Sequence, residues 1–218
     1  MHRFRFAVAA VVLLSAACEK PAPPPADTAT AAPPAAPAPT PTVTAPAEFK
    51  VRLETSKGPV VIQLHRDWSP NGADRFFQLV GEGYYNDARF FRVIPKFIVQ
   101  FGMNGDPATN AKWADQRIPD DPVKQSNARG TVTFAKCGMP NCRSTQIFIN
   151  LGDNAGLDAQ GFAPIGTVVE GMSVVDRLYS GYGDPPGDQQ DNISSAGNAY
   201  LAKNFPKLDF IRTATVVK

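Results

Sequence analysis

Apolar and polar residues alternate in two short segments that follow a long stretch rich in proline and alanine. The alternating apolar positions are Phe49, Val51, Leu53, Val60, Ile62 and Leu64. A period of two places such side chains on one face of a β-strand. Between the two segments, "SKGP" supplies the glycine and proline of a turn. Residues 48–65 are therefore predicted to form a β-hairpin.

The next apolar pattern has the period of an α-helix. In "SPNGADRFFQLVGEGYY", Ser69 can act as the N-cap and Pro70 suits the first helical position. The apolar stripe consists of Ala73, Phe76, Phe77 and Val80. A helix is therefore predicted from residue 70 to Gly81 or Gly83.

Further short apolar segments are bounded by Gly, Pro, Asn and Asp. They predict strands at 89–94, 97–102, 131–135, 146–150, 164–169 and 207–218, and a second helix at 170–181. Many short strands with two helices favour a mainly β fold, a closed antiparallel barrel with helical caps. Residues 181–206 are rich in Gly, Pro and Asp, then helical around "GNAYLAKNF", and are interpreted as a surface excursion.

The N-terminus has the pattern of an export signal over residues 1–17. Two arginines precede an apolar run of twelve residues, which is shorter than the about 20 that a membrane-spanning helix needs. The run ends in "LLSAAC", which resembles a bacterial lipobox and makes Cys18 the expected lipidation site. Cleavage near Ala17 as an ordinary signal peptide is the alternative.

The segment after Cys18 lacks the residues for a core. Of the 29 residues from 19 to 47, 10 are proline and 10 are alanine, which favours extended polyproline II structure. Residues 18–47 are therefore predicted to be a lipidated cysteine and a linker, and residues 48–218 one folded domain. The expected location is the bacterial cell envelope, with the protein lipid-anchored to a membrane and its domain facing the periplasm or the cell exterior.

The balance of charges excludes one class of partner. The chain has 22 Lys and Arg residues against 20 Asp and Glu residues, and removal of residues 1–17 takes away two arginines and no acid, leaving 20 of each. The remaining sequence has no basic run. A nucleic-acid partner is therefore not expected.

Cys137 and Cys142, in "CGMPNC", are the other two cysteines. In an exported protein, cysteines this close are expected to form a disulfide, and two reduced thiols are the alternative. After residue 17 the sequence has a single histidine, His65, so neither a metal site nor a Ser-His-Asp triad is expected. The sequence has no glycine-rich nucleotide motif, and no cofactor is predicted.

The stretch "FFRVIPKFIVQFG", residues 90–102, places one arginine among apolar residues. If the strands on either side of "IPK" pair, then Arg92, Ile98 and Gln100 converge on one surface. A charged guanidinium in such surroundings is costly unless it has a partner or a role. The two alternatives are an arginine that faces a substrate groove and a buried arginine that pairs with a carboxylate.

Four segments, in this order along the chain, resemble the cyclophilins. They are "FFRVIPKFIVQFG" (90–102), "RGTVTFA" (129–135), "STQIFIN" (144–150) and "LDAQGFAPIGTVVEGMSVVD" (157–176). The resemblance implies a peptidyl-prolyl cis-trans isomerase with an eight-stranded antiparallel barrel capped by two α-helices.

The resemblance also implies roles for individual residues. Arg92 corresponds to the catalytic arginine, and Gln100 to the glutamine that holds the substrate near the prolyl bond. The remaining substrate-binding positions are Phe97, Ile98, Ala135, Gln146, Phe148, Leu157 and Phe162. The expected partners are Pro-containing segments of exported proteins, and the chain is expected to be a monomer.

Four positions depart from the family pattern. Gly156 and Phe162 stand where the family has a pocket tryptophan and a pocket histidine, and Phe101 and Lys136 replace a glycine and an asparagine. The changes at Gly156, Lys136 and Phe101 leave a second hypothesis open, a tethered module that binds Pro-containing segments with little or no catalysis. A third hypothesis, a lipocalin-like carrier, requires a hollow barrel, whereas the bulky residues of the strands favour a filled one.

Overall fold

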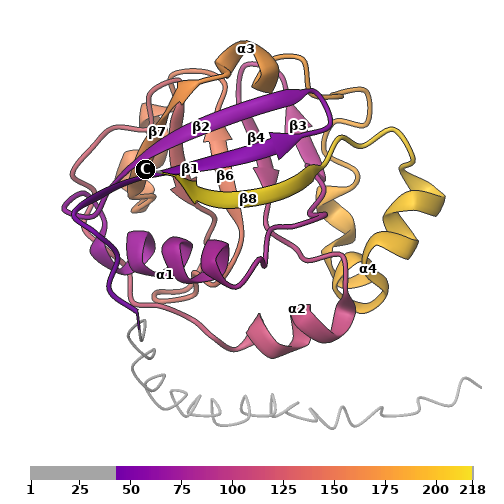
Figure 1. Cartoon of the computed structure of the whole chain (residues 1–218), viewed down its shortest axis with the longest axis horizontal. Helices are drawn as coiled ribbons and strands as arrows, with labels where there is room; N and C mark the ends of the chain where they lie inside the picture. Colours follow the sequence, from indigo (N-terminus) through magenta and orange to yellow (C-terminus); the bar gives the residue numbers. More distant parts are fainter. Residues whose placement is uncertain (1–42, 218) are drawn as a thin grey trace, which may run out of the picture. The chain divides into compact units, whose positions relative to one another are not determined.

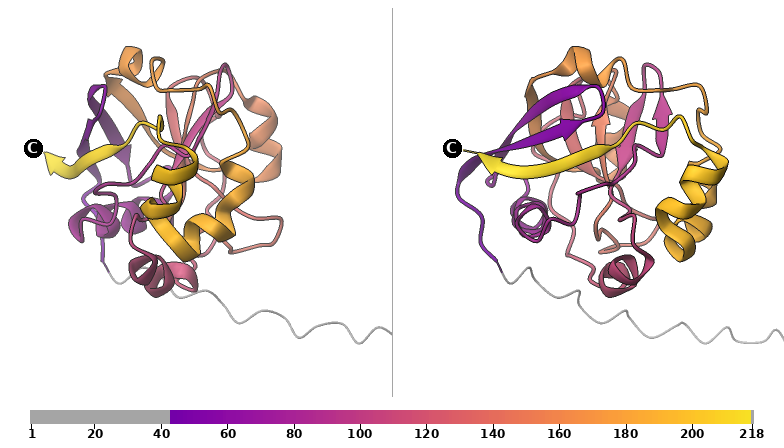
Figure 2. Two further views of the ribbon diagram at one scale, coloured as in Figure 1. Left: turned by 90° about the vertical axis from the view of Figure 1, so that its right-hand side faces the viewer. Right: turned by 45° about the vertical axis from the view of Figure 1, so that its right-hand side comes forward.

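A single antiparallel sheet organises residues 43–217, the part of the chain that the computed structural model describes. Its eight strands follow the order β3-β4-β6-β5-β7-β2-β1-β8 and curl around the core (Figures 1 and 2). Their bounds are β1 Glu48–Thr55, β2 Gly58–His65, β3 Arg92–Ile94, β4 Ile98–Phe101, β5 Thr131–Phe134, β6 Ile147–Asn150, β7 Pro164–Glu170 and β8 Ile211–Val217. The predicted signal peptide, Cys18 and most of the predicted linker lie outside the described residues.

The predicted hairpin is confirmed, but the prediction of a closed barrel was overstated. Thr55 of β1 lies opposite Gly58 of β2 across the turn. β3 and β8 are the two edges of the sheet and do not pair as strands in the described chain. Just before each of them, one isolated bridge joins Arg89 to Phe210. Because β3 has three residues, a few hydrogen bonds span this gap instead of a ladder, and the sheet is a half-barrel.

Helices cover the ends of the half-barrel. The described residues contain α1 Pro70–Gly81, α2 Pro107–Ala114, α3 Met172–Val175 and α4 Gln190–Asn204, with 3-10 helices η1 Ala155–Gln160 and η2 Gly187–Gln189. α1 agrees with the predicted helix, whereas α3 is a single turn of the helix expected over 170–181. After α3 the chain continues in tighter turns, since the Leu178 N–H donates to the Val175 carbonyl over 3.2 Å.

The sequence pattern does not predict α2, although its start carries a clear signal. Asp106 is the N-cap, and its carboxylate accepts hydrogen bonds from the N–H groups of Ala108 and Thr109, with Pro107 at the first helical position. The hydroxyl of Thr109 also donates to Asp106, and these hydrogen bonds lower the pKa of the Asp106 carboxyl. The helix is short and only weakly amphipathic, which is why an apolar period does not reveal it.

Ser69 does not cap α1 as predicted. Its side chain makes no capping hydrogen bond and instead donates to the carboxylate of Asp121. Asp121 also accepts the N–H groups of Asn71 over 3.2 Å and Gly72 over 3.0 Å, and so it satisfies the helix N-terminus from a distant loop. The Nη2 of Arg143 lies 2.9 Å from the same carboxylate, and both side chains are 2% exposed. The start of α1 therefore rests on a buried ion pair.

Large apolar side chains fill the interior of the half-barrel. The fully buried members include Leu53, Ile62, Leu64, Phe76, Leu79, Tyr85, Phe101, Phe134, Ile147 and Ile165. The rings of Tyr85 and Phe101 meet edge to face with 5.6 Å between their centroids. A filled interior has no space for a carried ligand, so the lipocalin-like hypothesis is not supported.

The predicted surface excursion, residues 181–206, is anchored to the half-barrel by its own apolar cluster. The buried members of this cluster are Phe91, Met103, Ile193, Leu201 and Leu208. α4 packs beside α2 (Figure 1), and the Asn198 N–H donates to the Gly105 carbonyl over 2.9 Å. At Gly197, φ is +55° and a Cβ would lie 2.1 Å from that carbonyl oxygen, so glycine is required there. The excursion is thus an ordered part of the domain.

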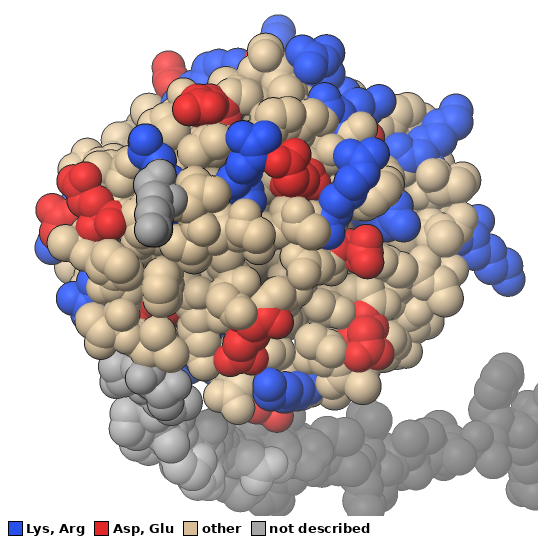
Figure 3. Space-filling model, viewed as in Figure 1, with Lys and Arg blue, Asp and Glu red and all other residues tan. Residues whose placement is uncertain are grey.

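The surface of the domain shows two further features. Ala45, within the predicted linker, is buried and donates its N–H to Asp74 over 2.8 Å, so contacts of the domain begin before Glu48. On the face drawn in Figure 3, basic and acidic side chains are interspersed. Within residues 43–217, the helices are too short or too polar to cross a membrane.

Candidate functional site

Three side chains stand in a row across neighbouring strands. Arg92 of β3 lies directly opposite Gln100 of β4, and Gln100 lies opposite Phe148 of β6. Residues that are opposite in an antiparallel pair present their side chains on the same face of the sheet. The predicted convergence of Arg92 and Gln100 is therefore confirmed, and it places a cation, an amide and an aromatic ring side by side.

The "IPK" turn sets this register. The Phe97 N–H donates to the Ile94 carbonyl over 3.0 Å, which closes the turn. Lys96 adopts φ = +63°, and Pro95 precedes it. A turn this short fixes which residues face one another, because a slip of one residue would move every side chain to the other face of the sheet.

The row opens onto a pocket of about 330 Å³. Its lining residues are Arg92, Phe97, Ile98, Gln100, Ala135, Lys136, Phe148, Leu157, Phe162, Asp184, Gly187, Asp188 and Gln190. Eight of the nine positions assigned by resemblance are in this set, and Gln146 lines an adjoining pocket of about 230 Å³. The two pockets share Gln100, Ala135, Lys136 and Gln190, so they form one continuous groove.

Arg92 faces this pocket and is not buried in the core. Its side chain is 26% exposed, and its guanidinium lies 5.9 Å from the ring centroid of Phe97. One Nη1 hydrogen bond reaches Gln100 Oε1 over 3.3 Å. Arg92 also pairs with Asp184, whose side chain is 52% exposed at the rim. The alternative of an arginine buried with its carboxylate is therefore wrong, although a carboxylate is present.

Apolar side chains form the floor and one wall. Ile98 and Phe148 are each 3% exposed, and the rings of Phe148 and Phe162 meet edge to face with 5.8 Å between centroids. Leu157 comes from η1, and the Phe162 N–H donates to the Leu157 carbonyl over 3.3 Å. A socket of this composition accepts an apolar ring such as that of proline.

The buried amide of Asn127 holds the wall in place. Asn127 donates to the Phe162 carbonyl over 2.8 Å and to Asp158 over 2.7 Å. Burial raises the pKa of the Asp158 carboxyl, but hydrogen bonds from Ser126 and Asn127 outweigh this effect, and the pKa lies below its ordinary value. η1 is thus attached to the loop that precedes β5.

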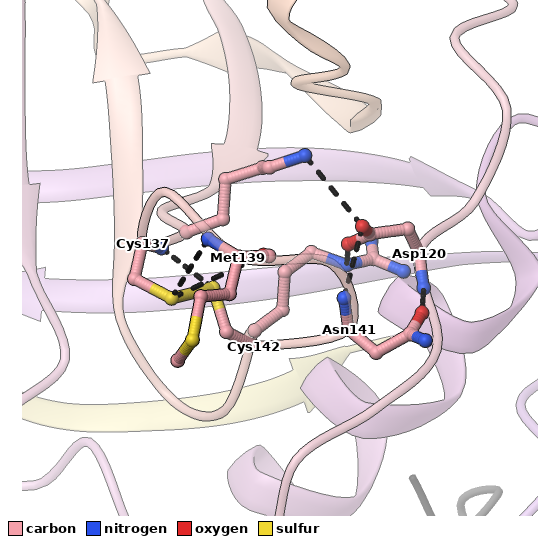
Figure 4. Close-up of a disulfide and its surroundings, with 7 residues drawn as sticks. Asp120, Cys137, Met139, Asn141 and Cys142 are labelled. Carbon is pink, nitrogen blue, oxygen red and sulfur yellow. Dashed lines mark hydrogen bonds and ion pairs between the residues drawn. A yellow bond between two sulfur atoms is a disulfide. The ribbon is translucent and has the colours of Figure 1, made fainter. Parts of the chain in front are cut away.

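A disulfide loop borders the second part of the groove. Cys137 is joined to Cys142 by a disulfide bond (Figure 4). Both residues line the adjoining pocket. Asp120 and Asn141 exchange two hydrogen bonds of 2.8 and 3.0 Å, which fasten this loop to a neighbouring segment. The Lys136 ammonium, which also lines the groove, lies 3.6 Å from the Asp120 carboxylate. The same segment therefore holds Lys136 in place.

Four pocket residues escaped the sequence prediction. They are Asp184, Gly187, Asp188 and Gln190, all from the segment that had been interpreted as a surface excursion. This segment closes the pocket on the side of Arg92. Its glycine, proline and aspartate content indicated a loop, but nothing in the local sequence indicated where the loop would lie.

Within residues 43–217, the side chains of His, Cys, Asp and Glu form no group of three or more that could hold a metal ion. The groove itself offers donors, acceptors and apolar surface. The chemistry that it supports is recognition and distortion of a bound chain.

Comparisons with known proteins agree with this geometry. The family model described as cyclophilin type peptidyl-prolyl cis-trans isomerase/CLD matches residues 50–198. A peptidyl-prolyl cis-trans isomerase of Acinetobacter baylyi is 34% identical over 142 residues, which cover 61% of this chain and 72% of that protein. Peptidyl-prolyl cis-trans isomerase B of Escherichia coli is 32% identical over 136 residues, covering 59% of this chain and 82% of that protein.

The fold is also found among solved structures. The crystal structure of a cyclophilin type isomerase of Cryptosporidium parvum matches with a TM-score of 0.58 and 20% identity, covering 78% of this chain and 98% of that one. A second crystal structure of that protein, in the presence of the dipeptide Ala-Pro, matches with a TM-score of 0.57 and 21% identity, covering 78% and 99%. The chain therefore belongs to the cyclophilin-type peptidyl-prolyl cis-trans isomerase family and is an enzyme of that class.

Proposed function

We propose that this isomerase acts on X-Pro bonds of exported polypeptides, with Arg92 as its catalytic residue and the adjoining pocket as its proline socket. The observation that carries this proposal is the row of Arg92, Gln100 and Phe148, all of which line the pocket. The row combines a hydrogen-bond donor with an apolar surface that can hold the proline ring.

The reaction requires rotation about a bond and no covalent chemistry. Rotation breaks the amide resonance of the X-Pro bond, which creates a barrier of about 18 to 20 kcal/mol. In the twisted transition state the prolyl nitrogen regains its lone pair and can accept a hydrogen bond. The Arg92 guanidinium donates that bond, and it does so only in the transition state, which is the condition for an effect on kcat.

The apolar wall and the side-chain amide of Gln100 bind different parts of the substrate. Phe148, Leu157 and Phe162 grip the proline ring while the chain on one side of the bond turns. Gln100 donates to Gln146 over 2.7 Å and accepts from Arg92, so it is oriented to hold the substrate backbone beside the prolyl bond.

The continuous groove favours polypeptides as substrates. Beyond the proline socket it extends along Ala135, Lys136 and the disulfide loop. A single dipeptide would leave this extension empty, whereas an unfolded chain would occupy both parts. Pro-containing segments of folding proteins therefore fit the groove better than small molecules do.

A refolding experiment tests the proposal. The chain, added in catalytic amounts, is expected to accelerate the slow phase of a protein whose refolding is limited by proline isomerisation. The rate should rise in proportion to the concentration of the chain. A slow phase that stays unchanged at every concentration would contradict the proposal.

The Leu157→Ala variant is expected to raise KM for a short Pro-containing peptide about 5- to 10-fold, because truncation removes about 1 to 1.4 kcal/mol of apolar contact with the proline ring. Leu157 grips the ring in both ground and transition states, so kcat should change little. Steady-state kinetics measure both constants. Val169→Ala, at a position that is 49% exposed on β7, is the control. An unchanged KM in Leu157→Ala would place the proline elsewhere.

We further propose that the protein is lipid-anchored at Cys18 in the bacterial cell envelope. The support is the sequence pattern of residues 1–17, the "LLSAAC" segment and the Pro/Ala-rich linker, all described above. Mass spectrometry of the mature N-terminus tests it. A diacylglyceryl cysteine is the expected first residue, whereas an unmodified N-terminus near residue 18 would indicate an ordinary signal peptide.

A further inference from the structure

The Asp184 carboxylate occupies one edge of the Arg92 guanidinium. It accepts from Nε, and its second oxygen lies 3.4 Å from Nη2. Gln100 takes one hydrogen of Nη1. A guanidinium has five N–H donors, so these three contacts leave one hydrogen on Nη1 and one on Nη2 for the substrate.

The hydrogen bonds continue from Arg92 along the floor of the groove and return to the segment that supplies Asp184. Gln100 Nε2 donates to Gln146 Oε1 over 2.7 Å, and Gln146 Nε2 donates to Gln190 Oε1 over 2.8 Å. Asp184 and Gln190 are six residues apart in the sequence. One short segment, 184–190, therefore holds both ends of the chain of polar side chains.

This segment is itself fixed in place. Ile193, just after it, is fully buried in the cluster that anchors residues 181–206. Gly187 lies against the aliphatic part of Arg92, where a Cβ would be 2.9 Å from Arg92 Cδ. A residue with a side chain would push the segment away from Arg92, so this glycine permits the close approach.

We propose that Asp184 is a positioning residue, which holds the guanidinium of Arg92 in the orientation that donates to the prolyl nitrogen. The inference rests on the proposed role of Arg92. An ion pair between side chains that are 26% and 52% exposed contributes little to the stability of the fold. Its effect on the rotamer of a long, partly exposed side chain is larger, because several staggered wells are open to an arginine that is not held.

Replacing Asp184 with asparagine tests this role. The amide keeps the shape of the side chain but turns a donor towards Nη2. We expect kcat to fall about 5- to 20-fold, in proportion to the fraction of molecules in which Arg92 is correctly placed, while KM changes less than about twofold. Asp184→Glu retains the carboxylate at an exposed site and should recover most of kcat. Asp191→Asn, which removes an exposed charge from the same region, is the matched control.

Two further measurements separate positioning from a structural effect. The Nε–Hε signal of Arg92 in 15N NMR spectra should exchange with water faster in Asp184→Asn than in the parent protein, with Arg92→Lys used to assign the signal. In the Arg92→Ala background, Asp184→Asn should cause no further loss of kcat, since residues that act as a unit are not additive.

The outcomes also distinguish this inference from the proposed function. If the parent is active and Arg92→Ala slows it, but Asp184→Asn has an equal or higher kcat, the positioning role is overturned alone, and a higher kcat would show that Asp184 competes with the substrate. If Arg92→Ala is as active as the parent, the role of Arg92 and that of Asp184 fall together. A loss of kcat in Asp191→Asn as large as that in Asp184→Asn would also overturn the inference, because charge rather than contact would be responsible.

Discussion

Replacing Arg92 with alanine is expected to lower kcat/KM for an X-Pro peptide about 10- to 100-fold, because the variant loses a charge-assisted hydrogen bond of about 1.5 to 3 kcal/mol in the transition state. The apolar socket stays intact, so most of the loss should appear in kcat. Exchange NMR on a short Pro-containing peptide measures the rate without a coupling enzyme. The variant should also fail to accelerate proline-limited refolding.

Arg52→Ala is the control for this experiment, since Arg52 is also an arginine of a strand, and its side chain pairs with Glu54 at the surface. It removes the same charge and should leave kcat unchanged. Equal rates for the parent and the Arg92→Ala protein would remove Arg92 from the mechanism. Negligible activity in the parent, together with undiminished binding of Pro-containing chains by the variant, would favour the tethered binding module instead.

The arrangement of Arg92 and Gln100 could be predicted because it depends on local sequence. Residues of alternating character flank a proline turn, and a short turn fixes the register of the two strands that it joins. The same reasoning gives the hairpin over 48–65, whose turn contains Gly58 at φ = +124°. Where the alternating pattern and the turn lie within about a dozen residues of each other, the local sequence is enough to predict the register of the two strands.

The other side of the pocket could not be predicted in this way. Asp184 lies 92 residues from Arg92 in the sequence, and no periodic pattern connects them. Their contact depends on how residues 181–206 fold back, which in turn depends on a small apolar cluster that includes Phe91 and Ile193. The four segments that carry the resemblance to the cyclophilins end at residue 176, before this segment, although the family model matches residues 50–198.

The start of α1 shows how a correct local signal can mislead. Ser69 precedes Pro70, and serine is a preferred N-cap residue, so a local rule predicts that the Ser69 side chain caps α1. In the structure, Asp121 accepts the N–H groups that Ser69 would otherwise satisfy, and Ser69 donates to Asp121. A carboxylate is a stronger acceptor than a hydroxyl, and it is also favoured at the positive end of a helix. Asp121 is therefore the residue on which this end of the helix depends.

The Asp121→Ala variant is expected to lower the free energy of unfolding by about 3 to 5 kcal/mol, because it removes the carboxylate that is hydrogen-bonded to the buried Arg143 guanidinium. Gly72 and Asn71 at the start of α1 lose their acceptor in the same step. For a domain of this size, each kcal/mol lowers Tm by about 2 to 4 °C, so a fall of roughly 6 to 20 °C is expected. Urea unfolding followed by circular dichroism gives the free energy directly. Asp121→Asn, which keeps one acceptor oxygen, should lose less.

The control for this variant is Glu54→Ala. Glu54 pairs with Arg52, and both side chains are 41% exposed, so this pair should contribute no more than about 1 kcal/mol. Each variant removes one carboxylate from one arginine, so the contrast compares an exposed pair with a buried pair whose carboxylate also accepts from the start of α1. Equal losses in Asp121→Ala and Glu54→Ala would show that Asp120, whose half-buried carboxylate lies 3.4 Å from Arg143 Nε, takes over as the partner of Arg143. Because Asp120 also pairs with Lys136 beside the groove, such a rearrangement would reach the substrate site, and kcat/KM of Asp121→Ala would then fall together with its stability.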